Sequence, residues 1–327
     1  MSLTQIRPAP PAPEQRSASI SKSKLWWHRF DTKAVPYLLI APFFVLFAIF
    51  GLFPLIYNAV VSLRHWRLDD PKKTGWAGFE NYTKVFADDV FWNALGNTFG
   101  IFILSTVPQL VLALIIANLL NHKLRFTTFW RVAVLLPYVT PVAASTLLFA
   151  MFFQRDSGMA NWFLSMVGFG QEEPLNWRAE KWSSWIAIAT MVNWKWIGYN
   201  ALLYLSAMQA IPKDVYEAAA VDGAGPQRQL WQITVPMIQP VLIFTVVLST
   251  IGGLQLFNEP MLFDENPALA SGGSDGQWQT IAQLIYQVGW RNGNLGSAAA
   301  MSWILFLIIL VVAGINALLT KRLGGGR

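Results

Sequence analysis

Two stretches of this sequence place polar and aromatic side chains in otherwise apolar surroundings. NWKWIGYN runs from Asn193 to Asn200, and GGLQLFNEP runs from Gly252 to Pro260. Polar residues inside apolar segments are costly and usually face a protein interior, where they mark binding sites. Aromatic rings can cover the C–H faces of a neutral polyhydroxylated ligand, while amides and carboxylates bond its hydroxyl groups. The candidate substrate-binding residues are Tyr138, Asn193, Lys195, Trp196, Tyr199, Gln255, Asn258 and Glu259.

The same residues have structural interpretations that the sequence leaves open. Asn193 and Asn200 could form hydrogen bonds between helices, which contribute about 0.5–2 kcal/mol each in a membrane. The tryptophans could belong to an aromatic belt at the membrane surface. Lys195 and Glu259 could neutralise each other, or one of them could contact the ligand.

The elements that position these residues are apolar helices. The chain has 327 residues, of which 54% are hydrophobic and 13% are charged, whereas a soluble domain carries about 25% charged residues. A block of roughly 20 mostly apolar residues is long enough to cross a bilayer as a helix. We therefore predict an all-α fold, an integral membrane bundle of six transmembrane helices. The six apolar blocks are 35–63, 97–120, 130–153, 183–208, 236–257 and 297–320.

The distribution of charge predicts which side of the membrane each loop faces. The two terminal segments and the loops at 121–131 and 209–235 together carry 14 Lys and Arg and five acidic residues. The other three loops together carry nine Lys and Arg and 13 acidic residues. By the positive-inside rule, both termini are cytoplasmic. This placement accounts for the net charge of +6 without a nucleic-acid partner. Residues 1–24 are predicted to form a disordered cytoplasmic tail, and residues 25–327 the membrane domain.

The sequence lacks the residues needed for metal binding, ATP hydrolysis and several kinds of enzyme catalysis. The chain has no cysteine, and its three histidines, His28, His65 and His122, have no metal-ligand spacing, so we predict no metal site. It has no GxxxxGK[ST] phosphate loop, which excludes it as an ATP-hydrolysing subunit. It also lacks GxSxG and an intramembrane His/Glu cluster, so a membrane-embedded enzyme is disfavoured.

The loop at 209–236 has the pattern of two short helices. Helix-forming residues run from Pro212 to Val221, Gly223 is a helix stop, and Pro226 suits the first turn of a second helix. The side chains of alanines 218–220 are small, so a partner's backbone can come close to this helix. The residues alone leave two interpretations open, a helix for docking a partner or a capped turn that only connects two spans.

This loop resembles a motif of one transporter family. EAAAVDGAGPQRQLWQITVP is similar to the EAA motif of permease subunits in bacterial ATP-binding-cassette (ABC) importers, and QAIPKDVYEAAAVDGAG resembles the carbohydrate branch, similar to the larger membrane subunit of maltose-type importers. GFENY near Gly78, LPYVTP from Leu136 and LGSAAAMSWILF from Leu295 fit the same branch. The resemblance covers about 35–320 and implies a type I ABC importer permease fold. No large external insertion domain is present, which is a departure from the larger maltose-type subunits.

The resemblance implies a division of labour among subunits. The chain would be the permease subunit of a sugar importer in the bacterial inner membrane, forming half of the path for a disaccharide or short oligosaccharide. Its partners would be a second homologous permease, two ATPase subunits that bind ATP and Mg, and an extracytoplasmic sugar-binding protein, while this chain would bind no cofactor. The implied sugar pocket includes positions matching Tyr138, Lys195, Trp196, Tyr199 and Asn258. The residues implied to couple the chain to the ATPase are Asp214, Tyr216, Glu217, Ala218, Ala219, Asp222, Gly223, Ile233 and Pro236.

The alternative function is a self-sufficient secondary transporter or channel for a polar solute. Against it, no predicted span carries a chain of Asp, Glu and His suited to a proton relay. A docking helix would also have no purpose in such a protein. Deleting a partner ATPase separates the two hypotheses, because only the importer loses all transport.

Overall fold

The computed structural model describes residues 35–70, 74–122, 124–170, 173–264 and 271–324. This part of the chain divides into two compact units, one ending at Tyr57 and the other beginning at Asn58. The predicted disordered tail, residues 1–24, lies outside the described residues. Apart from one pair of two-residue strands, the regular structure of the described chain is helical, as the sequence predicts.

The first unit is apolar helix throughout its described length. Helix α2 (Val35–Phe47) continues through a π-helical turn (Ala48–Leu52) into α3 (Phe53–Ser62). Its side chains are exposed from Pro42 to Tyr57. An apolar helix with exposed side chains suits contact with lipid or with another membrane helix.

Membrane-spanning helices are recognisable by length and composition. Three pass this test: Tyr37–Ser62, helix α5 (Asp89–Asn121), and Leu295–Asn316 within α16 (Leu295–Gly324); two bent pairs raise the number to at most five in the described chain. The predicted block 183–208 forms α9 (Lys181–Gln209), whose 29 residues span about 43 Å. Its lysine, asparagines and tryptophans lower its hydropathy below that of the others. A count of six spans therefore stays a prediction.

Block 130–153 is not the single continuous helix that the sequence analysis expects. It forms α6 (Thr127–Val139) and α7 (Val142–Phe152), which are bent by 92°. Thr140 and Pro141 between them are extended, with ψ of 133° and 134°. Proline lacks an N–H and disfavours helical geometry in the residue before it, so the chain breaks here instead of kinking.

The predicted block 236–257 is broken in the same way. Its first residues belong to α12 (Val235–Met237), which follows α11 (Pro226–Gln229) and a π-helical turn (Leu230–Thr234). The remainder forms α13 (Gln239–Leu254). The two parts are bent by 72°.

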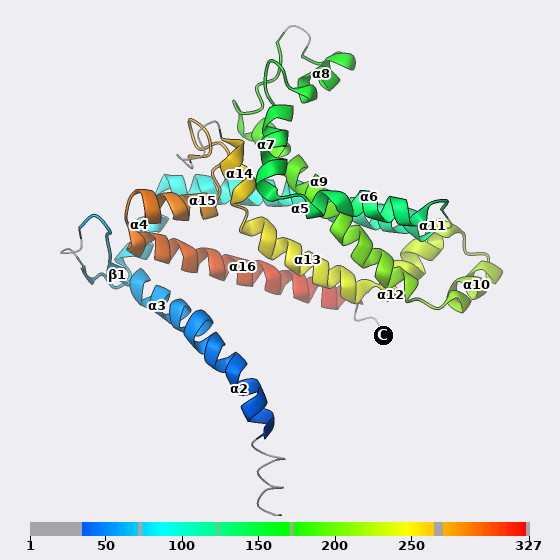
Figure 1. Cartoon of the computed structure of the whole chain (residues 1–327), viewed down its shortest axis with the longest axis horizontal. Coiled ribbons are helices and arrows are strands. Elements are labelled where there is room, and N and C mark those ends of the chain that lie inside the picture. Colours follow the sequence, from blue (N-terminus) through cyan, green and yellow to red (C-terminus); the bar gives the residue numbers. More distant parts are fainter. Residues whose placement is uncertain (1–34, 71–73, 123, 171–172, 265–270, 325–327) are drawn as a thin grey trace, which may run out of the picture. The chain divides into compact units, whose positions relative to one another are not determined.

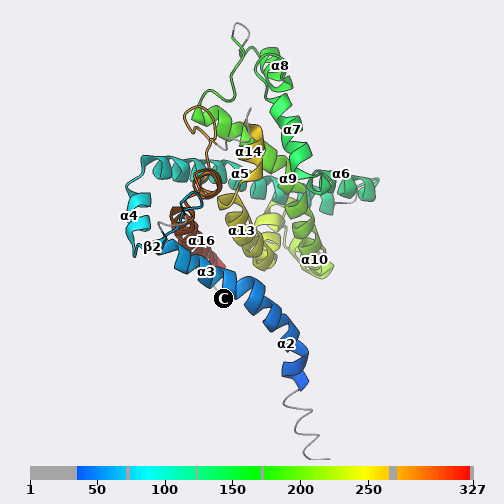
Figure 2. The same ribbon diagram turned by 60° about the vertical axis from the view of Figure 1, so that its left-hand side comes forward.

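In the second unit, α5, α9, α13 and α16 form the packed core. Helix α5 lies against α9 and α13, α6 lies against α9, and α13 lies against α16 (Figures 1 and 2). Polar bonds connect these helices within the apolar core, as neutral side chains do between membrane helices. They are Gln109 Nε2 to Ser249 Oγ at 3.3 Å, Asn316 Nδ2 to Thr250 Oγ1 at 2.9 Å, and Tyr204 Oη with Thr245 Oγ1 at 2.6 Å.

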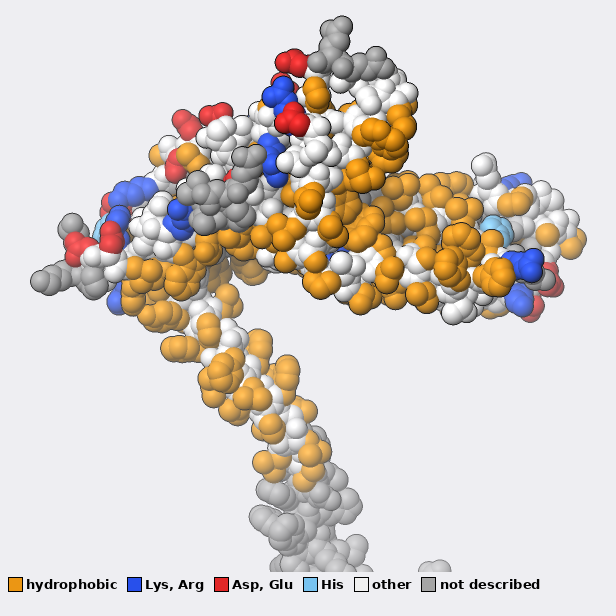
Figure 3. Space-filling view, turned by 45° about the horizontal axis from the view of Figure 1, so that its top comes forward, with side chains coloured by type: hydrophobic (Ala, Val, Ile, Leu, Met, Phe, Trp, Pro, Cys, Tyr) orange, Lys and Arg blue, Asp and Glu red, His pale blue; other side chains and the backbone are white. Residues whose placement is uncertain are grey.

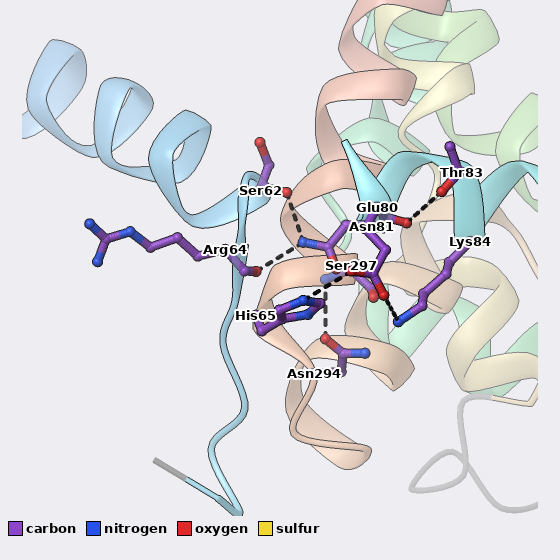
Figure 4. Close-up of polar contacts among 9 residues, drawn as sticks. All are labelled: Ser62, Arg64, His65, Glu80, Asn81, Thr83, Lys84, Asn294 and Ser297. Atoms are coloured by element: carbon purple, nitrogen blue, oxygen red, sulfur yellow. Dashed lines mark hydrogen bonds and ion pairs between the residues drawn. The ribbon is translucent and has the colours of Figure 1, made fainter. Parts of the chain in front are cut away.

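A short strand pair, which the all-α prediction lacks, follows α3. Strand β1 (Arg64–His65) pairs antiparallel with β2 (Gly75–Trp76) ahead of α4 (Glu80–Phe86). Asn81 of the GFENY motif is buried and donates to the carbonyls of Ser62 and Arg64 at 2.8 and 2.9 Å (Figure 4). The amide of Gly296, in the LGSAAA motif, donates to the Trp66 carbonyl at 3.2 Å. Two motifs far apart in the sequence therefore hold the same loop.

Charged side chains surround this loop. Glu80 contacts His65 at 3.1 Å and Lys84 at 2.7 Å (Figure 4). The hydrogen bond from Lys84 lowers the pKa of Glu80, and the bond from Arg67 lowers the pKa of Asp69. These carboxylates therefore stay ionised at neutral pH.

Several short helices lie between the long ones. ANWFLSMVG lies in α8 (Met159–Met166), and QTIAQLIYQVGW contains α15 (Ile281–Tyr286) and the π-helical turn Gln287–Arg291. Thr280 caps α15 through a capping box with Gln283. A further short helix, α14 (Asn258–Phe263), packs on α7 and α9.

Helices α6 and α9 approach so closely that a substitution at their contact tests the packing. A Cβ atom on Gly198 of α9 would lie 1.8 Å from the Val134 carbonyl oxygen of α6, whereas a Cβ on Gly252 of α13 would meet nothing within 4 Å. We expect Gly198→Ala to lower the melting temperature in detergent, at a cost of about 1–3 kcal/mol. Gly252→Ala is the matched control and should be neutral or slightly stabilising. Equal melting temperatures for the two variants would show that this contact is not tight.

Candidate functional site

Three aromatic candidates from the sequence meet in the structure. Tyr138, near the end of α6, stacks on Tyr199 of α9 with ring centroids 4.7 Å apart. Trp196 lies edge-on to Tyr138 at 5.3 Å and to Tyr199 at 5.9 Å. All three side chains are half-buried, so each keeps ring surface available to a ligand. We call these three residues the ring cluster.

Lys195 lies beside the ring cluster but is directed at the backbone of α6. Its side chain is buried, with 7% of its surface exposed, and its Nζ donates to the Thr140 carbonyl oxygen at 2.9 Å. Glu259 of α14 is also buried, and the charge of Lys195 acts on its carboxylate. Within the described chain the two groups form no direct ion pair, so whether they neutralise each other or contact a ligand stays an open prediction.

The two asparagines of NWKWIGYN face the protein interior. Asn193 Nδ2 lies 3.5 Å from the Leu104 carbonyl oxygen of α5, and its Oδ1 is buried without a partner. Asn200 is buried, and its Nδ2 finds no hydrogen-bond partner in the part of the chain that the structure describes. Asn193 therefore acts between helices, as its structural interpretation predicts, and its role toward a ligand stays a prediction.

The polar candidates after α13 are divided between the surface and the interior. Gln255 and Asn258 are exposed, and Glu259 is buried. Among the described residues, no hydrogen bond or ring contact joins Gln255 or Asn258 to the ring cluster. The structure thus brings together the candidates on α6 and α9. Gln255, which follows α13, and Asn258, which begins α14, form no such contact with them.

Two residues that position the ring cluster are absent from the sequence-based candidates. Gly198, between Trp196 and Tyr199, permits the close approach of α6, and Thr140 supplies the carbonyl that Lys195 binds. A glycine between aromatic residues and a threonine before a proline are the local signals that could have indicated them.

Three cavities of the described chain lie away from the ring cluster. One of about 610 Å³ is lined by residues of and around α8, including Arg155, Asn161 and Trp162. Another of about 530 Å³ is an entirely apolar groove between α5 and α16. A third, of about 320 Å³, lies beside α4 and the start of α16. The ring cluster lines none of these three, and its three residues are half-buried.

The predicted docking helix is α10 (Lys213–Val221), and it ends as the sequence analysis expects. The amide of Ala224 donates to the Ala219 carbonyl at 2.9 Å, and the amide of Gly223 donates to the Ala220 carbonyl at 3.1 Å. These bonds form a Schellman motif, which needs a left-handed residue at its centre. Gly223 supplies it, with φ of +79°.

One face of α10 is attached to the bundle. Tyr216 Oη shares a hydrogen bond with Thr234 Oγ1 at 2.9 Å, and Val215, Tyr216 and Leu230 pack on the cluster formed by the ends of α5 and α9. Ile233 is half-buried, whereas Trp231 is 62% exposed. The π-helical turn at 230–234 changes the direction of successive side chains relative to an α-helix.

The opposite face of α10 is open. Asp214, Glu217, Ala218, Ala220 and Asp222 are exposed, and Ala219 is half-buried. Val221, an apolar residue, is 88% exposed. Figure 3 shows charged side chains gathered at the end of the bundle that carries α10 and at the end that carries β1, with hydrophobic side chains between them.

Comparisons with known proteins agree with this arrangement. The family model described as "Binding-protein-dependent transport system inner membrane component" matches residues 98–325. The arabinooligosaccharides transport system permease protein AraP of Halalkalibacterium halodurans is 33% identical over 293 residues, covering 89% of each chain. The lactose transport system permease protein LacF of Rhizobium radiobacter is 33% identical and covers 85% of this chain and 91% of its own.

The fold also has a counterpart among solved structures. A bacterial alginate ABC transporter, solved in complex with an alginate pentasaccharide-bound periplasmic protein, contains a chain with a TM-score of 0.76 and 20% identity, covering 91% of this chain and 98% of that one. The apolar helices and the family match make this a multi-pass membrane protein and a transport component, not a known kind of enzyme. The chain belongs to the family of inner membrane components of binding-protein-dependent transport systems.

Proposed function

We propose that this chain is the permease subunit of an ABC importer for a disaccharide or short oligosaccharide. The observation that carries the proposal is the ring cluster, in which Tyr138, Trp196 and Tyr199 from two helices present half-buried aromatic surface. Aromatic faces stack on the C–H faces of sugar rings, whereas an ion path would need charged or carbonyl groups in their place. Relatives named for arabinooligosaccharides and lactose support a sugar as cargo.

The polar part of the pocket is proposed to come from the segment around α14. Gln255 and Asn258 are exposed amides that can bond sugar hydroxyls, and Glu259 and Asn193 stay candidates nearer the interior. The ring cluster lines none of the three described cavities, so we infer that a second permease closes the pocket. Each subunit would then form half of the translocation pathway.

The open face of α10 is proposed to couple the permease to ATP hydrolysis. Glu217 is exposed beside small alanines, which allows a cation on an ATPase to reach it and the partner's backbone to come close. Tyr216 joins α10 to Thr234, so a force on α10 also reaches the segment that leads to α13. The proposed partners are two ATPase subunits carrying ATP and Mg, a second permease and an extracytoplasmic sugar-binding protein, with no cofactor on this chain.

The proposed topology places both termini and α10 in the cytoplasm, in the inner membrane of a bacterium. The excess of Lys and Arg beside these segments supports it. A self-sufficient secondary transporter would need its own energy source, such as a relay of ionisable groups. Among the described residues of α5, α9, α13 and α16 up to Asn316, Lys195 is the only such intramembrane group away from the helix ends.

Co-purification is the direct test of the importer proposal. We expect mild-detergent affinity purification from the native host to yield an ATPase, a second permease and a sugar-binding protein, identified by mass spectrometry. Recovery of the chain alone or as a homodimer would favour the secondary transporter.

Replacing a ring tests the sugar pocket. We expect Trp196→Leu to raise the half-saturating sugar concentration for uptake by about tenfold, since one aromatic contact contributes about 0.5–1.5 kcal/mol beyond its area. Phe306→Leu is the matched control, because Phe306 is exposed on α16. Uptake would be measured with labelled arabinotriose, lactose or maltose, whichever the wild type accepts. An unchanged concentration dependence in Trp196→Leu would remove the ring from the pocket.

A backbone substitution tests coupling. Gly223→Val places a β-branched residue at a φ of +79° and should distort the end of α10. We expect ATP hydrolysis by the assembled complex to persist while uptake falls at least tenfold, about the effect of 1.4 kcal/mol. Gly225→Ala is the control, since Gly225 has φ of −68° and free space around it. Normal uptake in Gly223→Val would contradict a coupling role.

A further inference from the structure

We infer that Lys195 is a positioning residue, which holds the break between α6 and α7 and thereby sets the place of Tyr138. Its ammonium group binds the Thr140 carbonyl and is not used as a sugar ligand. This inference rests on the proposed function only in the statement that the ring cluster binds sugar. The position of the helix break itself does not depend on that statement.

The end of α6 leaves carbonyls that the helix itself cannot satisfy, and the Thr140 carbonyl is one of them. The Thr140 amide donates to the Pro137 carbonyl and its Oγ1 donates to the Leu136 carbonyl, both at 3.2 Å, so these two bonds close the end of α6. Thr140 and Pro141 are extended, and the first bond of α7 runs from the Ser145 amide to the Pro141 carbonyl. Among the described residues, no backbone amide donates to the Thr140 carbonyl, which lies between the two helices. In a bilayer such a group needs a partner from the protein.

A lysine is suited to this carbonyl for an electrostatic reason. The C-terminal end of a helix carries partial negative charge and attracts a cation. Lys195 is buried at the end of α6, where water cannot replace its hydrogen bond. Glu259 is buried as well, but no ion pair joins it to Lys195 in the described chain, and the ammonium bonds the backbone. A neutral side chain would lose the attraction to the helix end.

The bond lies close to the ring cluster along both helices. Tyr138 precedes Thr140 by two residues, and Tyr199 follows Lys195 by about one helical turn. The stack of Tyr138 on Tyr199 at 4.7 Å, the approach of Gly198 to Val134 and the Lys195 bond thus form three successive contacts between α6 and α9. Releasing the last contact frees the end of α6 on which Tyr138 stands.

A second proline in the bundle shows the same arrangement. Pro108 lies inside α5 and lacks the N–H that would bond the carbonyl of Leu104, four residues earlier. Asn193 of α9, two residues before Lys195, directs its Nδ2 at that carbonyl from 3.5 Å. Two polar side chains of α9 therefore supply donors where prolines have removed or displaced backbone donors.

Spin labels can measure the break without any sugar. The chain contains no cysteine, so Phe129→Cys on α6 and Leu148→Cys on α7 can be labelled selectively, and both positions are exposed. The label-to-label distance would be measured by pulsed electron paramagnetic resonance on the complex as purified, in lipid nanodiscs. We expect Lys195→Met to lose the single narrow distance of the parent, and Lys195→Arg to keep it. Lys181→Met, at the exposed start of α9, is the matched control and should match the parent.

Uptake by the same variants separates positioning from sugar binding. We expect Lys195→Met to reduce uptake about tenfold or more together with the change in distance, because a displaced binding group loses much of its effect, and Lys195→Arg to retain both. Should Lys195→Met fail to assemble, Lys195→Gln decides, since glutamine is uncharged and shorter. A variant with the parental distance but a raised half-saturating sugar concentration would overturn the inference and make Lys195 a ligand. Failure of every tested sugar would count against the proposed cargo and leave the distance result standing.

Discussion

Every backbone carbonyl inside a bilayer needs a donor from the protein, and this requirement organises the bundle around α9. Prolines interrupt α5 and separate α6 from α7, and each interruption leaves a carbonyl without its helical amide. Side chains of α9 donate to these carbonyls instead. Asn193 donates to the Leu104 carbonyl, and Lys195 donates to the Thr140 carbonyl. The bends of the neighbouring helices can persist because α9 is polar at the positions that face them.

This requirement explains why α9 is the least apolar of the predicted spans and which of its residues are available for a ligand. Side chains that complete the backbone of a neighbour are occupied within the chain, whereas Trp196 and Tyr199 use only part of their surface on Tyr138. Polar character inside a span therefore has two origins here, a structural one and a functional one. The rings are proposed to belong to the second, because in the described chain part of their surface stays exposed.

The sequence predicts the features that depend on neighbouring residues, and it misses those that depend on distant ones. The end of α10 at Gly223 and the shared face of Trp196 and Tyr199 are recognisable because glycine chemistry and helical spacing are local, whereas Tyr138 joins them only through the family resemblance. The strand pair β1–β2, the exposure of Trp231 and the 92° break at Thr140 are not, because each depends on which segment packs alongside. Pro141 indicates a disturbance of the helix, but Pro108 has no such break in α5. Both prolines have a polar donor from α9 close by, so residue spacing alone does not distinguish the proline that a helix tolerates from the one at which it ends.

The same helix also joins the two candidate sites. Helix α9 runs from Lys181 to Gln209 without a proline, and α10 begins at Lys213. Trp196 therefore lies about 20 Å along a continuous helix from the start of the connection to α10. Helices α6 and α13 each adjoin a sharp bend, which can absorb a displacement, but α9 adjoins none along this length. In an importer, a movement of α10 on its ATPase would reach the rings along α9 with little loss, and the contacts of α6 with Gly198 and Lys195 would carry it across to Tyr138.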